Sequence, residues 1–377
     1  MIYLDNAATT PLRKCCLEVI ENYGINLFYN PSALYEGGVN ASMAISQARH
    51  KLASLLNTQP ETLIFTSSGT ESNNHVLQCA RKRKGGRIIV SDTEHSSVFA
   101  VVNDLKMKGF DIVFAPVDAY GRIVPSEFKK LLTPETCLVS IMHVNNVTGA
   151  VNPIQDLVKI TKSFKKDILF HCDGVQAFCK ILVNPEALGV DFYSISGHKV
   201  GAPKGVGMLY VKKGIHLAPY ILGGGQEKGM RSSTENVAGI VSLAMAATEA
   251  HSEMSILKEK AEVFFGKIRD ILSALPNLQW LSGDKTAPHI LTFAMDGVRG
   301  EVLMHSLEKY GIMVGIGSAC SSNGGVGRIA KALKLDNTHY EGVIRLSISA
   351  STDENQAEYV GKAIVEEYNN LVKYKRI

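Results

Sequence analysis

The sequence predicts an α/β protein in which a large domain with a mainly parallel, seven-stranded sheet is joined to a small α+β domain. Over the first two thirds of the chain, short apolar runs rich in β-branched residues alternate with segments of helical period. These runs are continuously apolar, which is typical of strands covered by helices on both faces. After Val211 the alternation stops, and 377 residues with 45% apolar content can fill more than one core.

Each strand of the large sheet is predicted from its own apolar run. The seven candidates are Thr62–Thr66, Arg87–Ser91, Asp111–Ala115, Thr136–Met142, Asp167–Cys172, Asp191–Ser196 and Val206–Val211. Apolar residues at steps of three and four predict helices over Ala41–Leu56, Val98–Lys108 and Ile154–Lys165. This alternation of strand and helix favours parallel strand pairing.

The last third of the chain predicts a separate, smaller domain. One long helical stretch, Asn236–Leu275, leaves the sheet domain as a connector. The tail then holds two strands and two helices: Ile290–Ala294, Val343–Ser349, Glu301–Tyr310 and Glu354–Val372. We expect residues 15–250 to form the large domain, and residues 1–14 and 251–377 the small one.

Composition and charge exclude several classes of protein. The net charge is only +4 and the Lys and Arg residues are scattered, so binding to nucleic acid is not expected. The longest uncharged apolar stretch, Val237–Thr248, is too short to span a bilayer, and the N-terminus resembles no signal or transit peptide. Seven cysteines without CxxC spacing argue against a disulfide framework and a zinc site. We expect a cytoplasmic protein with free thiols and no membrane partner.

Polar residues follow two of the predicted strands. The segment Ser67–Ser72 leads into a helix whose free N–H groups can bind a phosphate, although an ordinary helix N-cap has the same pattern. Asp173 and Gln176 follow a strand expected at the centre of the sheet. Ligands of open α/β sheets bind at such strand ends, although an N-cap alone would also explain Asp173.

Three more strand ends carry polar residues. Lys199 follows one of them and can form a Schiff base with a carbonyl cofactor, although most single lysines are only solvated. His95 and Asn145 follow two others. No single N-cap or solvated side chain explains this convergence, which predicts a catalytic face.

A glycine-rich segment, Gly315–Gly325, contains the remaining candidate. Cys320 lies at its centre, in surroundings too polar to pack as core. Free cysteines are usually buried, so a thiol in a segment of this composition is either a tolerated surface residue or a reactive one. The glycine-rich composition predicts mobility and favours the reactive role.

The order and spacing of these motifs resemble the cysteine desulfurases, pyridoxal-phosphate (PLP) enzymes of the class V aminotransferase type. The resemblance covers nearly the whole chain, and the serine-rich cysteine segment is similar to the group with a longer, mobile cysteine loop. It rests on these residues: Tyr3–Thr10, Asn30–Ser32, Thr70, His95, Asn145, Asp173, Lys199, Arg231–Asn236, Gly317–Cys320 and Ile344–Ser347. It implies PLP-dependent transferase fold type I.

The resemblance also implies a role for each candidate residue. Lys199 would bind PLP covalently and move protons at the substrate α-carbon, while Asp173 would pair with the pyridine nitrogen. Gln176 would bond the ring hydroxyl, and His95 would stack on the ring and take part in acid–base steps. The phosphate would be held by Gly69, Thr70, Ser196 and His198, with Thr234 reaching in from the second subunit of a homodimer.

The substrate implied by the resemblance is L-cysteine. Arg345 and Asn145, the latter also beside the cofactor, would bind its carboxylate, and Asn30 would assist. Cys320 would take the sulfur as a persulfide, release L-alanine, and pass the sulfur to an acceptor protein for iron–sulfur clusters, thio-cofactors or thiolated tRNA. No resident metal is expected, although Cys320 could transiently share an iron–sulfur cluster with a scaffold.

Four residues depart from the pattern of the family. Tyr35 replaces a histidine, Val147 a glutamate, Ser233 a glycine, and Ile316 a small hydroxyl residue. We expect these changes to alter packing or rate, because the lysine, its aspartate and the thiol all remain. Alternative functions are a selenocysteine lyase, another PLP β-lyase, and a cluster scaffold without catalytic turnover.

Overall fold

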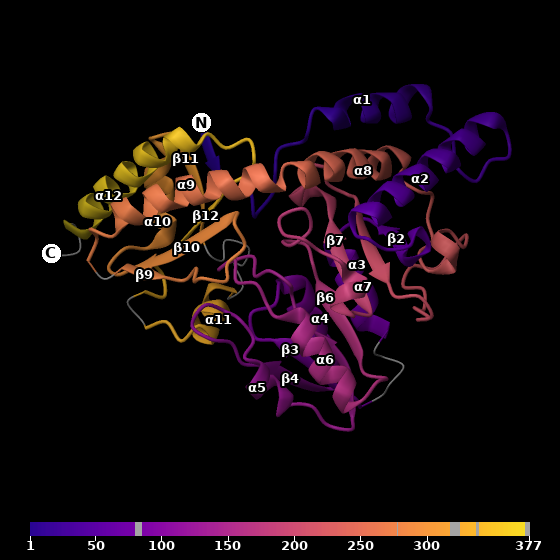
Figure 1. Ribbon diagram of the computed structural model, residues 1–377, viewed down its shortest axis with the longest axis horizontal. Helices are drawn as coiled ribbons and strands as arrows, with labels where there is room; N and C mark the ends of the chain where they lie inside the picture. Colours follow the sequence, from indigo (N-terminus) through magenta and orange to yellow (C-terminus); the bar gives the residue numbers. More distant parts are fainter. Residues whose placement is uncertain (80–84, 277, 317–324, 337–338, 374–377) are drawn as a thin grey trace.

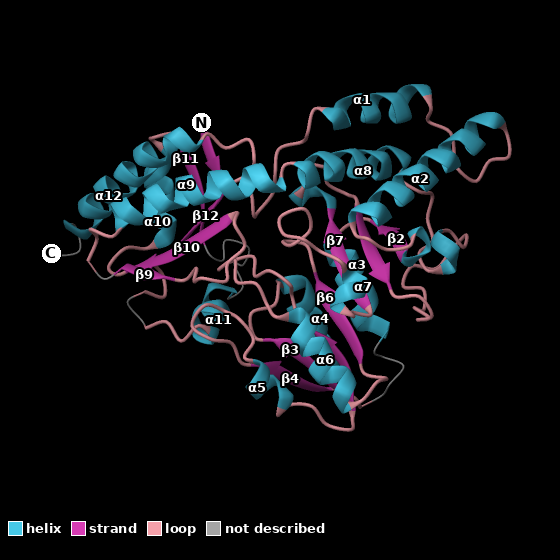
Figure 2. Ribbon diagram, in the orientation of Figure 1, coloured by secondary structure: helices cyan, strands magenta, loops and turns pink. Residues whose placement is uncertain are grey.

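The structure is a computed structural model that describes residues 1–79, 85–276, 278–316, 325–336 and 339–373. Two sheets lie in separate parts of the molecule, and helices cover both (Figure 1). Secondary structure alternates along the larger part, as the sequence predicts (Figure 2). The predicted α/β class, with a seven-stranded, mainly parallel sheet, is confirmed.

The larger sheet has the strand order β2-β8-β7-β6-β5-β3-β4. All its neighbours pair in parallel except at β8, which is antiparallel to both strands beside it. The bounds are β2 Leu63–Thr66, β3 Arg87–Ser91, β4 Asp111–Ala115, β5 Thr136–Ser140, β6 Leu169–Asp173, β7 Phe192–Ser196 and β8 Gly207–Val211. The carboxyl ends of the six parallel strands therefore meet at one edge.

Helices cover both faces of this sheet because its strands are apolar on both sides. Side chains of α2, α6 and α8 share one hydrophobic cluster with Phe65, Ile89 and Phe170. Side chains of α3 and α4 pack on Ile88 and Val90, which point the other way. The helix bounds are α1 Cys15–Glu21, α2 Glu36–Leu55, α3 Gly69–Cys79, α4 Ser96–Met107, α5 Pro125–Lys129, α6 Ile154–Phe164, α7 Pro185–Leu188 and α8 Val237–Ser252.

The smaller sheet has the order β1-β11-β12-β10-β9 and its own core. Among its described strands, only β1 and β11 pair in parallel, so this part is α+β as predicted. Its elements are β1 Ile2–Leu4, α9 Met254–Leu272, β9 Leu278–Trp280, β10 Ile290–Met295, α10 Gly300–Glu308, β11 Ile312–Ile316, α11 Gly325–Ala332, β12 Val343–Ser347 and α12 Ala357–Lys373. The exact domain boundaries stay a prediction.

Several predicted bounds differ from the structure. The long stretch Asn236–Leu275 is two helices, because α8 packs in the core of the larger sheet and α9 in that of the smaller one. The break is at Glu253, whose ψ of 1° ends α8 and whose carboxylate binds Arg13 at 2.6 Å. Strand β5 ends at Ser140 rather than Met142, since the Met142 N–H donates to the side-chain Oε1 of Glu94 and not to a neighbouring strand.

Candidate active site

A cavity of about 270 Å³ lies at the carboxyl ends of the parallel strands. Its walls come from the ends of β2, β3, β5, β6 and β7, from the N-terminal segment, and from β12 of the smaller sheet. The lining residues are Ala7, Ala8, Ser68, Gly69, Thr70, Asn73, His95, Ser97, Met142, Val144, Asn146, Asp173, Val175, Gln176, Ser196, His198, Lys199 and Arg345. Nine of the predicted site residues are among them, so the structure brings most of the predicted catalytic face together.

Asp173, the last residue of β6, is a buried carboxylate of this cavity. It accepts hydrogen bonds from Asn73 Nδ2 at 2.7 Å and from the Val175 N–H at 3.0 Å. Gly174 permits this turn because a Cβ there would overlap the ring of Tyr193. Burial, and to a lesser extent the charge of Asp173, raise the pKa of the neighbouring Glu94 well above its ordinary value.

Lys199 ends the short 3₁₀ turn η4 (Gly197–Lys199) that follows β7. Its Nζ donates to the carbonyl oxygens of Ala7 and Ala8, both at 2.6 Å. These carbonyls belong to the segment that follows β1. The N-terminal segment therefore holds the amine at the cavity, an arrangement that the sequence did not indicate.

His95 is the N-cap of α4, and its ring is neutral at pH 7 because burial lowers its pKa. Its Nδ1 accepts from the Ser97 N–H at 3.1 Å, so the proton of the neutral ring is on Nε2. The Ser97 hydroxyl in turn accepts from Asn73 Nδ2 at 2.9 Å, which links His95 to Asp173. Asn73 was missed in the sequence, although a polar residue beside Val76 and Leu77 on the sheet-facing side of α3 could have indicated it.

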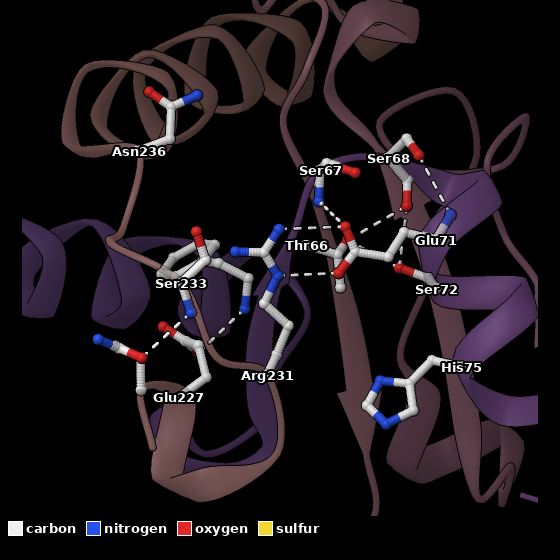
Figure 3. Close-up of polar contacts among 12 residues, drawn as sticks. Thr66, Ser67, Ser68, Glu71, Ser72, His75, Glu227, Arg231, Ser233 and Asn236 are labelled. Atoms are coloured by element: carbon white, nitrogen blue, oxygen red, sulfur yellow. Dashed lines mark hydrogen bonds and ion pairs between the residues drawn. The ribbon is translucent and has the colours of Figure 1, made fainter. Parts of the chain in front are cut away.

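The start of α3 supplies hydroxyl and N–H groups to the cavity through Ser68, Gly69 and Thr70. Glu71, in the same turn, accepts from the Ser67 N–H at 2.8 Å and from Arg231 Nε at 2.9 Å (Figure 3). Arg231 thereby compensates the charge of Glu71 beside this helix start. On the other side, burial and nearby cations lower the pKa of His198 to about 4, so its ring is neutral.

Arg345 reaches the cavity from β12, which belongs to the smaller sheet. Its Nη1 donates to the Asn146 carbonyl and its Nη2 to Asp5 Oδ1, both at 2.6 Å. Its Nε is buried without a partner among the described residues. Since Asp5 already occupies one end of the guanidinium, a substrate carboxylate would have to share Arg345 with it or replace it.

The structure corrects the prediction for Asn145. This side chain is fully buried and turned into its own loop: Oδ1 accepts from the N–H groups of Val147 and Thr148 at 2.8 and 2.9 Å. Its Nδ2 contacts the Thr93 carbonyl at 3.3 Å, and Asn145 does not line the cavity. Asn146 lines it instead, with an Oδ1 that is buried and has no partner among the described residues.

Two other predicted residues lie outside the cavity, and one lies outside the described residues. Asn30 and Thr234 are exposed, and Asn30 Oδ1 accepts from the Ser32 N–H at 2.9 Å. Cys320 belongs to residues 317–324, which the structure does not describe.

Ser233, which stands where the family resembled has a glycine, has a φ of 130°, a backbone conformation that favours glycine.

In the described part of the chain, no group of three or more His, Cys, Asp or Glu side chains is arranged to hold a metal ion. The same residues contain no helix with the length and apolar character needed to cross a membrane.

Comparisons with known proteins agree with the fold. The family Aminotransferase class-V matches residues 2–360. The chain is 38% identical to the cysteine desulfurase IscS of Dictyoglomus turgidum, over all of this chain and 97% of that protein. A solved NifS-like protein matches with a TM-score of 0.92 and 34% identity, over 98% of this chain and 100% of that one. A solved structure of SspA in complex with cysteine matches with a TM-score of 0.82 and 32% identity, over 94% and 100% of the two chains.

Proposed function

The chain belongs to the class-V aminotransferase family and, within it, to the cysteine desulfurases, and from this premise we propose how its residues divide the reaction. The protein is a PLP-dependent cysteine desulfurase. The roles of single residues rest on one observation above all. Lys199 and Asp173 line the same cavity at the strand ends, together with the hydroxyl groups at the start of α3.

The residues of this cavity fit PLP. The N–H and hydroxyl groups at Gly69, Thr70 and Ser196 suit a phosphate, and neutral His198 can donate to it. Asp173 suits a protonated ring nitrogen, and the amine of Lys199 suits an aldehyde. When bound there, PLP supplies an electron sink that stabilises negative charge on the substrate α-carbon.

We assign the proton transfers to Lys199 and His95. Lys199 takes the proton from the substrate α-carbon, and the carbonyls of Ala7 and Ala8 keep its amine at the cavity. His95 offers an Nε2–H, because its Nδ1 is engaged by Ser97. Asp173 keeps a proton on the ring nitrogen, and the donors Asn73 and Val175 stabilise its negative charge.

Binding of the substrate carboxylate is assigned to Arg345 and Asn146. A guanidinium suits a carboxylate, and Asn146 Nδ2 can add a donor from the cavity wall. This assignment replaces Asn145, whose amide is engaged within its own loop. An assisting role for Asn30 stays a prediction.

Sulfur transfer is assigned to Cys320. Its thiolate donates an electron pair to the sulfur of L-cysteine while the bond from that sulfur to the β-carbon breaks. The β-carbon keeps the electrons of the broken bond and takes up a proton, which yields L-alanine. The enzyme retains a Cys320 persulfide, so atoms and electrons balance without an external oxidant. A thiol of an acceptor protein can then take the outer sulfur by exchange.

We also propose that the enzyme is a homodimer, because large apolar side chains are exposed on one set of neighbouring elements. Helices α1, α2 and α8 lie together at one end of the molecule (Figure 1). The exposed side chains on these elements and the segments beside them are Leu12, Leu17, Ile20, Ile25, Phe28, Leu34, Tyr35, Val39, Met43, Tyr220, Leu222 and Met245. We call this set the apolar face. Monomeric proteins rarely expose such a patch, and a second copy of the chain would cover it.

The dimer would also explain Thr234. This residue is exposed and lies on the same segment as Tyr220 and Leu222 of the apolar face. Its hydroxyl would reach the phosphate in the second subunit. We call residues Ile221–Asn236 the arm.

A cytoplasmic location and a protein acceptor complete the proposal. In the described part of the chain, Cys15, Cys16, Cys172 and Cys179 are free thiols, as is usual in a reducing compartment. The acceptor would be an iron–sulfur scaffold, a thio-cofactor enzyme or a tRNA-thiolating enzyme, since each needs sulfur in the transferable form of a persulfide.

The test is mass spectrometry of the protein after incubation with L-cysteine in the absence of reductant. The peptide that contains Cys320 should gain one sulfur atom. The peptide with Cys15 is an internal control, because burial raises the pKa of the Cys15 thiol to about 12 and leaves it protonated. C320S should keep the absorption of bound PLP and lose sulfide release, and K199A should lose the covalent PLP linkage. Undiminished sulfide release by C320S would refute the role of Cys320.

A further inference from the structure

A buried histidine outside the cavity contacts one of the residues proposed to bind PLP. His289 immediately precedes β10 of the smaller sheet and is 1% exposed. Its Nε2 lies 3.3 Å from Oε1 of Gln176, which lines the cavity from the larger sheet. The contact therefore joins the two parts of the molecule directly behind the site.

The hydrogen bonds around Gln176 determine which way its amide points. Gln176 Nε2 donates to the Ala7 carbonyl at 2.8 Å, and a carbonyl oxygen can only accept. The amide oxygen therefore points to His289. Because that oxygen also only accepts, the proton of the His289 ring must be on Nε2.

The surroundings of His289 keep this ring neutral. Burial lowers its pKa well below the ordinary value, and the positive charges of Lys180, Arg345 and Lys199 lower it further. In a neutral ring with its proton on Nε2, Nδ1 carries no proton and can only accept a hydrogen bond. This Nδ1 is buried without a partner among the described residues, so the ring has a single polar contact there, the one to Gln176.

We propose that His289 is a positioning residue that holds the Gln176 amide in one orientation, so that Gln176 offers an N–H and never its carbonyl to the ring oxygen of PLP. This inference rests on the proposed function, in which Gln176 faces that oxygen. One of the two Gln176 N–H groups is used by Ala7, and the second remains for the cofactor. Without the His289 donor, only the contact with the Ala7 carbonyl would oppose a turn of the amide that presents its oxygen to the cavity.

The orientation matters for the charge of the cofactor. An N–H donor withdraws negative charge from the ring oxygen, and that charge helps to retain the proton on the nitrogen that links Lys199 to PLP. A donor therefore lowers the pH at which this nitrogen loses its proton, an event that changes the visible absorption of the enzyme. Loss of the donor should raise that pH, by on the order of one unit.

The experiment is a pH titration of the visible absorption band in holoenzymes. H289M should shift the midpoint upward, whereas H289Q, which can place an amide N–H near the position of Nε2, should restore a midpoint close to that of the wild type. H75M is the matched control. His75 is also 1% exposed and also has a buried, unpartnered Nδ1, but its Nε2 contacts the Ala218 carbonyl away from the cavity. It should not shift the midpoint.

Two outcomes would overturn the role of His289. One is a wild-type midpoint in H289M. The other is a His289 ring that carries its proton on Nδ1, which ¹⁵N-histidine NMR of wild-type holoenzyme can detect even if the variants do not fold. A wild-type protein that binds no PLP would instead refute the proposed function, and the role of His289 with it.

Discussion

At the residue scale, two neighbouring asparagines of one sequence motif have different surroundings. Asn145 is fully buried, and its Oδ1 closes a turn by accepting two backbone N–H groups. Asn146 lines the cavity, and its buried Oδ1 has no hydrogen-bond partner in the described part of the chain. The sequence places both in the same strand-end motif, and only the direction of each side chain distinguishes the asparagine engaged in its own loop from the one proposed to bind the substrate.

The two asparagines should therefore respond differently to substitution. N145A leaves buried N–H groups unpaired and should lower the free energy of unfolding by about 2–3 kcal/mol. N146A should leave stability within about 1 kcal/mol of the wild type and raise KM for L-cysteine roughly tenfold, since one donor to the substrate is lost. Urea unfolding and steady-state kinetics of both variants check this. A normal KM for N146A would return the binding role to other residues.

A second residue with an unusual environment is Lys180, which is 8% exposed. Burial lowers its pKa to about 8, from an ordinary lysine value of 10.5. Below pH 8 the ammonium is charged in both the folded and the unfolded chain, and burying it opposes folding. Between pH 8 and 10.5 the folded chain releases the proton while the unfolded chain keeps it, so the contribution of Lys180 to stability rises with pH.

K180M should remove this pH dependence. At pH 7 the variant should be more stable than the wild type, and that advantage should shrink by about 3 kcal/mol as the pH approaches 10.5, which is the shift from 10.5 to about 8 expressed as free energy. Urea unfolding of both proteins across this pH range measures the difference in their free energies of unfolding. The contributions of other titrating groups cancel in this difference, because both proteins contain them. An advantage that stays constant with pH would show that Lys180 titrates normally.

At the element scale, the arm is held by two ion pairs whose partners lie on the larger sheet and its helices. Glu227, whose carboxylate is 4% exposed, binds Arg49 at 2.7 Å and also accepts from the Phe65 N–H at 3.0 Å. Arg231 binds Glu71 beside the proposed phosphate site (Figure 3). These contacts hold a segment with strained backbone, in which Glu227, Lys228 and Ser233 all have positive φ.

R231M should therefore weaken both folding and PLP binding. It leaves the largely buried carboxylate of Glu71 without its cation, which should cost about 3 kcal/mol of stability. It also frees the arm that carries Thr234, so the dissociation constant for PLP, measured by absorbance, should rise roughly tenfold. R87M is the control: its pair with Asp111 is half-exposed, so stability should change by less than about 1 kcal/mol and PLP affinity should not change.

The elements that the sequence predicts well are those that carry their own pattern. The predicted strands Arg87–Ser91 and Asp111–Ala115 match the structure residue for residue, because both are apolar runs between clear breaks. Strand β1 has three residues and pairs with β11 more than 300 positions later, so no local pattern indicates it. The break at Glu253 was missed for a similar reason: both helices are apolar, and what separates them is the core that each one faces.

The same distinction applies to the candidate site. Strand-end residues such as Asp173 and Lys199 could be predicted, because their positions follow from the topology of a parallel sheet. The carbonyls of Ala7 and Ala8 and the contact of His289 with Gln176 could not, because backbone acceptors and contacts between distant segments leave no mark in the local sequence.

At the scale of the whole molecule, the proposed dimer would make each site depend on a second subunit through the apolar face and the arm. If the face is an interface, charges placed on it should separate the subunits. Leu34 is 96% exposed and Met43, on α2, is 53% exposed. Neither side chain packs in the core of the single chain, so L34E/M43E should keep the fold. Burial of the two introduced carboxylates in a dimer interface would be unfavourable.

Sedimentation velocity should find the wild type as a dimer and L34E/M43E as a monomer. The monomer should also retain PLP more weakly, because no Thr234 arrives from a partner. M107E is the matched control, since Met107 is 82% exposed at the end of α4, outside the apolar face, and should leave the dimer intact. A wild type that sediments as a monomer and still retains PLP would refute both the dimer and the reach of Thr234. A dimeric double variant would place the interface on another surface.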